Sequence, residues 1–136
     1  MPIVVILPAH GHGHVHLHLQ SAHLEHNEGG LLNKMDPFVH IKVGHEEWTS
    51  SVAHDGGKNP QWAGQHMKVD TGLISHQMHI KVFNAHGGHQ GIHIAEAELP
   101  FNFFTEQGPR EEWVQLHFNG QPAGRVHFKS EFHSHN

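Results

Sequence analysis

Histidine is the side chain that offers the widest range of chemistry in this sequence, and it occupies 20 of 136 positions. Its ordinary pKa is about 6.5, so its charge changes within the pH range that a cell reaches by modest acidification. The formal net charge is −5 when every histidine is neutral, and adding twenty protons would bring it to +15. Two kinds of chemistry follow from this composition: a surface charge that depends on pH, and the binding of metal ions by imidazole.

The spacing of the first histidines suits both kinds of chemistry. His14, His16 and His18 alternate with aliphatic residues, which is the period of a half-buried strand. Residues i and i+2 of a strand lie on one face about 6.5 Å apart, so two or three of these imidazoles can reach one zinc, copper or nickel ion. Because alternation requires only polar residues at exposed positions, histidines without any function explain the pattern equally well.

Two further groups of histidines are candidate metal sites, namely a loop site at His86, His89 and His93 and a tail site at His133 and His135. In a chain so rich in histidine such pairs arise readily, so their spacing carries less weight than usual. The sequence also shows no matched carboxylates that would orient the ligands. Zinc or copper is therefore an optional ligand, and no cofactor is required.

The elements that position these residues are predicted to be strands. Apolar residues alternate with His, Lys or Arg in the segments 39–43, 78–82 and 125–129, and glycine- or proline-rich turn signals separate such segments. No convincing amphipathic helix is present, so an all-β sandwich is expected. The length favours a single domain over 1–136, with 1–12 as an extension or extra strand and 133–136 as a tail.

Composition excludes several classes of function. The chain has no cysteine, which rules out disulfides and thiolate chemistry, and a cytoplasmic protein is the default expectation. No segment approaches the roughly 20 apolar residues of a membrane helix. No nucleophile motif, phosphate loop or zinc-protease motif is present, so we expect no enzyme. The acidic charge at neutral pH disfavours nucleic acid as a partner.

Four segments together resemble a C2 domain, above all the small stand-alone plant-type C2 proteins: Gly13-x-Val15-x-Leu17-x-Leu19, Met35-Asp36-Pro37-Phe38-Val39, Asn59-Pro60-x-Trp62 and Ile94-Ala95-Glu96-Ala97-x-Leu99. The resemblance implies an eight-stranded antiparallel β-sandwich whose first strand lies near 14–20 and whose last lies near 125–132. These two strands would be antiparallel neighbours. The sequence departs from the family pattern after Trp62, where a one-residue bulge is expected to turn Met67 and Val69 inward.

The resemblance also indicates that the family's calcium site is incomplete. The positions that correspond to its carboxylates are Gly30, Asp36, Asn84, His86 and Ile92. Calcium takes six to eight oxygen ligands, and only Asp36 offers a carboxylate here. Conventional calcium binding is therefore not expected, and an aspartate before a proline is also a common turn cap.

The surfaces expected to meet a membrane are the loop tips, with Leu31, Leu32 and Ile92, and the face formed by the first and last strands, with His14, His16, His18 and His127. His40 and His79 are expected on other solvent faces. Many C2 domains hold anionic lipid with a permanent lysine patch, whereas the six lysines of this chain are scattered along it.

The function predicted from these features is a calcium-independent C2-like module that binds anionic phospholipid membranes from the cytoplasm and is gated by histidine protonation. The alternatives are a transition-metal-binding protein and a structural or protein-interaction module. For the metal function the candidate ligands are His14, His16, His18, His86, His89, His93 and Asp36. The sequence leaves open a protein partner and the oligomeric state.

Overall fold

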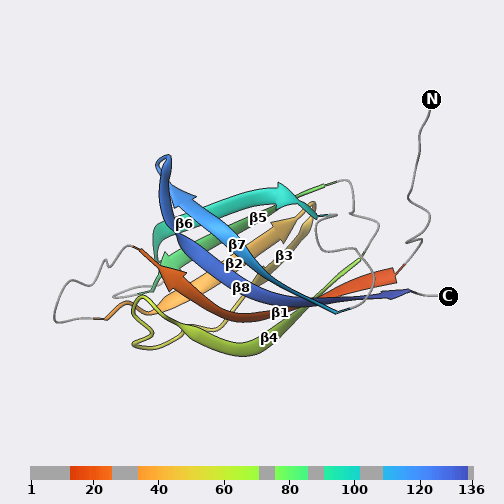
Figure 1. Cartoon of the computed structure of the whole chain (residues 1–136), viewed down its shortest axis with the longest axis horizontal. Helices are drawn as coiled ribbons and strands as arrows, with labels where there is room; N and C mark the ends of the chain where they lie inside the picture. The colour runs from red at the N-terminus through yellow and green to blue at the C-terminus, as the bar shows by residue number, and fades with distance from the viewer. Residues whose placement is uncertain (1–12, 26–33, 71–75, 86–90, 102–108, 135–136) are drawn as a thin grey trace.

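The structure, a computed structural model, describes residues 13–25, 34–70, 76–85, 91–101 and 109–134. These residues form eight β-strands (Figure 1): β1 (Gly13–Leu24), β2 (Pro37–Val43), β3 (Glu46–Thr49), β4 (Gln61–Asp70), β5 (Gln77–Asn84), β6 (Ile92–Pro100), β7 (Arg110–Phe118) and β8 (Gln121–Ser134). In the described ranges, no helix has the length and apolarity needed to cross a membrane.

The strands are hydrogen-bonded in the order β3-β2-β5-β6-β7-β8-β1-β4, and all neighbours are antiparallel. The junction between β6 and β7 is narrow, because one register pair, Glu96 with His117, joins them. The junction divides the strands into two four-stranded halves, β3-β2-β5-β6 and β7-β8-β1-β4, that enclose the core. This arrangement confirms the predicted antiparallel β-sandwich.

The alternation in β1 separates the core from the surface as the sequence predicts. Val15, Leu17 and Leu19 are at most 1% exposed, whereas the histidines between them lie half-buried on the outer face. Each such aliphatic side chain stabilises the fold by roughly 1.5–3 kcal/mol relative to an exposed position. β1 pairs with β8 from Gly13 to Leu24, so the first and last strands are antiparallel neighbours, as expected (Figure 1).

The departure expected after Trp62 is an irregularity in β4. Ala63 and Gly64 both have positive φ, at 55° and 78°, which turns the chain out of regular strand geometry. The register with β1 shifts at this point, and Met67 and Val69 point into the core, at 4% and 0% exposure. The inward orientation of these two residues is therefore confirmed, and it places the residue between Gln65 and Met67, His66, on the outer face.

Candidate functional site

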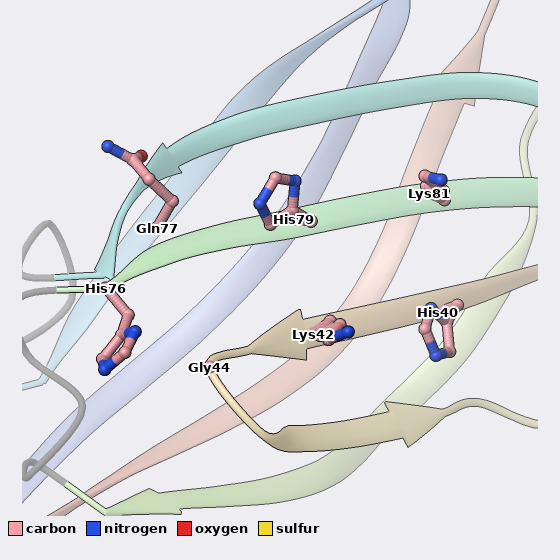
Figure 2. Close-up of a pocket in the computed structure, with 7 residues that line it drawn as sticks. All are labelled: His40, Lys42, Gly44, His76, Gln77, His79 and Lys81. Atoms are coloured by element: carbon pink, nitrogen blue, oxygen red, sulfur yellow. The ribbon is translucent and has the colours of Figure 1, made fainter.

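A groove with a volume of about 390 Å³ lies on the outer face of β2 and β5, and we call it the β2–β5 groove. Its lining consists of His40, Lys42, Gly44, His76, Gln77, His79 and Lys81. His40 lies opposite Lys81 and Lys42 lies opposite His79 in the register of the two strands. Figure 2 shows these four side chains rising from the same face of the two strands. Two lysines thus converge among three histidines.

Three glutamates flank this groove, and each lies beside a histidine. The Nε2 of His40 is 3.0 Å from Oε1 of Glu47, on β3. On the β6 side, the Nε2 of His79 is 3.9 Å from Oε2 of Glu98. These contacts are ion pairs only when the imidazole is protonated. The charge of the face therefore depends on whether its histidines carry protons.

The third histidine–glutamate pair lies at the far end of the same face. The Nε2 of His93 is 3.2 Å from Oε1 of Glu96, yet this buried nitrogen has no hydrogen-bond partner among the residues that the structure describes. The ring of His93 packs between Phe83 and Phe118, with centroid distances of 5.4 Å and 5.2 Å. Glu96 faces Lys81 across the β5–β6 pair.

The sequence contains a signal for the groove that alternation within a single strand does not reveal. The tetrapeptide His-Ile-Lys-Val occurs twice, at 40–43 and at 79–82. When two copies pair antiparallel about Ile41 and Ile80, each histidine faces the lysine of the other copy. Two of the six lysines, which look scattered along the chain, are brought together in this way.

A second group of histidines, the histidine cluster, lies on the outer face of the other half of the sandwich and consists of His16, His18, His66 and His133. Neighbouring ring centroids are 4.8 Å apart from His16 to His66, 4.8 Å from His18 to His66 and 4.6 Å from His16 to His133. From the sequence, His16 and His18 are predicted site residues, His133 is expected in the tail, and His66 has no expected role. His133 in fact belongs to β8, where it faces His14.

The closest contact in the cluster is the imidazole pair His16–His66. The Nδ1 of His16 is 2.7 Å from the Nε2 of His66, and the ring planes differ by 1°. Parallel rings cannot stack face to face at this separation, because atoms in van der Waals contact are about 3.5 Å apart. The two rings therefore lie side by side with parallel planes, and one ring nitrogen donates a hydrogen bond to the other.

The surroundings of the imidazole pair disfavour the charged form of both rings. Burial lowers the pKa of His16 most, followed by the positive charges of His133, His66, Lys68 and His18. Burial is also the largest cause that lowers the pKa of His66, followed by His18 and Lys68. Both rings are consequently neutral near neutral pH.

The remaining predicted site residues are dispersed. His127 shares the outer face of β8 with the histidine cluster, but it stacks on Trp113 at 4.6 Å, and its Nε2 is 3.0 Å from Oε2 of Glu111. Ile92 begins β6 with 47% of its surface exposed. The predicted residues Leu31, Leu32, His86, His89 and His135 lie outside the described residues.

Asp36 and Asn84, at two positions of the family's calcium site, are engaged with the backbone. The Oδ1 of Asp36 accepts a hydrogen bond from the N–H of Asp55 at 2.8 Å. The Oδ1 of buried Asn84 accepts one from the N–H of Asp36 at 2.9 Å. Both oxygens stabilise the local turn. Across the part of the chain that the structure describes, no three His, Asp or Glu side chains are arranged to hold a metal ion.

The chain is an antiparallel sandwich of eight strands with a groove lined by lysines and histidines on one face. The family model for the C2 domain matches residues 13–116, and this chain therefore belongs to the C2 domain family. C2 domains are in general binding modules and not enzymes.

Solved structures show the same fold. A C2 domain of plant extended synaptotagmin 1 aligns with a TM-score of 0.75 and 17% identity, over 91% of this chain and 96% of that chain. A C2 domain-containing protein whose gene is described as elicitor-responsive aligns with a TM-score of 0.72 and 21% identity, over 92% and 91%. A structure of two C2 domains of extended synaptotagmin 2 aligns with a TM-score of 0.70 and 19% identity, over 90% and 41%.

Proposed function

We propose that this C2 domain binds anionic membrane surfaces through the outer face of β3-β2-β5-β6, and that histidine protonation, not calcium, controls the binding. The observation that carries the proposal is the arrangement of three histidine–glutamate pairs around Lys42 and Lys81. C2 domains commonly bind lipid, and a permanent lysine patch is one way in which they do so. Here the lysines are accompanied by carboxylates whose charge the histidines can neutralise.

The balance of charges on this face changes sign with pH. With neutral histidines, two lysines and three glutamates leave a charge of −1. Protonation of His40, His79 and His93 adds three charges and brings the face to +2. His76, which also lines the groove, adds a further charge when it is protonated.

The change in electrostatic binding free energy is large enough for histidine protonation to control membrane binding. A cationic side chain near an anionic leaflet contributes about 1 kcal/mol, so a change of three charges is worth about 3 kcal/mol, on the order of a hundredfold in affinity. At neutral pH the residual negative charge is repelled by the leaflet. In mild acid the same face is attracted, and the attraction weakens as salt screens it.

Independence from calcium is supported by the state of the family's calcium positions. The Oδ1 atoms of Asp36 and Asn84 already accept backbone hydrogen bonds, and the side chain of Ile92 has no oxygen to offer. Exposed Ile92 can enter the headgroup region without a bound cation, since burial of an aliphatic side chain is favourable. We assign the protein a peripheral, non-enzymatic role at a cytoplasmic membrane surface.

The test is vesicle sedimentation between pH 7.5 and 6.0, with phosphatidylserine vesicles compared with pure phosphatidylcholine vesicles. Each pH is measured with EDTA, with calcium and with zinc, at low and high salt. We expect the protein to bind the phosphatidylserine vesicles and not the phosphatidylcholine vesicles, and to do so in the presence of EDTA. The bound fraction should rise as the pH falls and decrease as salt is added. Binding that ignores pH in this range would overturn the switch. Binding that requires calcium would overturn calcium independence, and no binding at any pH would favour a protein partner instead.

A further inference from the structure

We infer that the imidazole pair His16–His66 is a binding site for one divalent transition-metal ion of the zinc, copper or nickel class. The site lies on β1 and β4, in the half of the sandwich that does not contain the β2–β5 groove (Figure 1). It differs from the sites expected from sequence, because its second ligand comes from a residue fifty positions away. The inference does not depend on the proposed membrane function.

The geometry of the pair carries the inference. Two imidazole nitrogens on different strands lie 2.7 Å apart in a hydrogen bond, and their ring planes are parallel to within 1°. The bond between them is of the type N–H···N, so one lone pair is already directed into the gap. One imidazole ring holds the bridging proton. If that ring releases this proton and takes up another at its second nitrogen, each ring presents a lone pair to the gap. The shift changes no net charge, so a neutral pair can bind a cation without releasing protons overall.

A slight separation and a marked tilt of the two rings convert the hydrogen bond into a chelate. Zinc–nitrogen bonds are about 2.0–2.1 Å long, which places two ligand nitrogens roughly 2.8–3.4 Å apart for angles between square-planar and tetrahedral values. The nitrogens must therefore separate by at most about 0.7 Å, and the lone pair of each ring must point about 35–45° away from the line that joins them. Both rings lie on the surface, where such tilts are available, while the strand register keeps their backbones in place.

The chemistry of the site selects the class of metal. Imidazole suits zinc, copper and nickel and is a poor ligand for calcium or magnesium. Two protein ligands leave the other positions to water, in agreement with the absence of any three-ligand group among the described residues. Of the charged groups on the neighbouring strands, Lys68 on β4 and Lys129 on β8 oppose a cation, whereas Glu131, opposite His16 on β8, favours one.

The first test is titration of the full-length protein with ZnCl₂ or CuCl₂ at pH 7.5, followed by calorimetry. His16→Gln and His66→Gln should each weaken the tightest site at least tenfold. His45→Gln removes an exposed histidine from the β2–β3 turn, and His79→Gln removes one from the groove, so both should bind metal like the wild type. If the imidazole-pair variants bind as tightly as the two controls, the inference is wrong.

The second test uses the wild-type protein and therefore does not depend on how a variant folds. Long-range ¹H–¹⁵N spectra report on individual ring nitrogens, and substoichiometric Zn²⁺ should shift the Nδ1 of His16 and the Nε2 of His66 before any other. Earlier shifts at other histidines would overturn the assignment. Vesicle binding by His66→Gln should stay at the wild-type level, which separates failure of the metal site from failure of the membrane function.

Discussion

His40 lies directly across the β2–β5 pair from Lys81, while its Nε2 is 3.0 Å from Oε1 of Glu47 on the other side. One imidazole thus stands between a fixed cation and a fixed anion. Protonation of that imidazole neutralises the charge of Glu47 and leaves Glu96, opposite Lys81 on β6, as the anion that faces the lysine. Lys42, His79 and the β6 carboxylates repeat the arrangement on the neighbouring strands.

The lysines and the histidines of the groove are predicted to have separable effects on vesicle binding. Lys42→Gln with Lys81→Gln should lower affinity at pH 6.0 by about 2 kcal/mol, roughly thirtyfold. His40→Gln with His79→Gln should instead flatten the pH dependence and leave the weak binding at pH 7.5 unchanged. Sedimentation over the pH series measures both effects, with His45→Gln as the surface control. A double histidine variant with an unchanged pH profile would show that other residues sense the pH.

Removal of a flanking carboxylate is predicted to mimic acidification. Glu47→Gln removes one negative charge from the face, so binding to anionic vesicles at pH 7.5 should rise about fivefold, the equivalent of about 1 kcal/mol. Glu25→Gln changes the net charge of the protein by the same amount outside this face and is the matched control. Equal responses of the two variants would mean that overall charge, and not the groove, governs binding.

The lowered pKa values of the imidazole pair predict that the folded protein loses stability in acid. The pKa values of His16 and His66 are lowered in the folded protein, mainly by burial, so between the folded value and about 6.5 the unfolded chain binds more protons. The free energy of unfolding should therefore be highest above pH 6.5 and should fall as the pH drops through that value. The contribution of these two histidines to the fall ends once both are protonated in the folded protein. Urea denaturation between pH 7.5 and 5.0 measures this dependence.

His66→Gln removes one of the two titrating groups and relieves the repulsion on the other. The variant should therefore lose less stability between pH 7.5 and 5.0 than the wild type does. His45→Gln should retain the full dependence. A slope that is the same in all three proteins would assign the acid sensitivity to other groups.

Two glycines with positive φ are predicted to respond differently to alanine. At Gly124, with φ +119°, a Cβ would lie 2.1 Å from the carbonyl oxygen of His23 on the paired strand β1. Gly120 lies in the β7–β8 turn with φ +79°, and apart from its chain neighbours no atom of the described residues lies within 4 Å of the same position. Gly120→Ala should cost only the backbone strain, about 1 kcal/mol, whereas Gly124→Ala must also push β1 and β8 apart.

Thermal denaturation of the two alanine variants checks this difference. Gly124→Ala should lower the melting temperature clearly more than Gly120→Ala does. Similar melting temperatures would indicate that β8 moves away from β1 at little cost. In either case the comparison measures how tightly the first and last strands are held together.

The sequence by itself determined which side of the regularly alternating strands faces the solvent and which family the chain resembles. Val15, Leu17 and Leu19 alternate with histidines, and in a strand this local period of two separates an apolar face from a polar one. The motifs around Asp36 and Trp62 indicated a C2 domain, and with it the pairing of the first and last strands. These predictions succeed because they depend on neighbouring residues or on short ordered motifs.

Only the tertiary structure decided which exposed side chains meet. His66 reaches His16 because β4 lies beside β1 and because an irregularity near Gly64 sets which β4 residues face outward. Lys42 and Lys81 converge because β2 and β5 pair in one particular register. Alternation is a property of a single strand, whereas neighbourhood and register follow from how all eight strands share one core. The histidines were therefore visible in the sequence, but their partners were set by the packing of strands far apart along the chain.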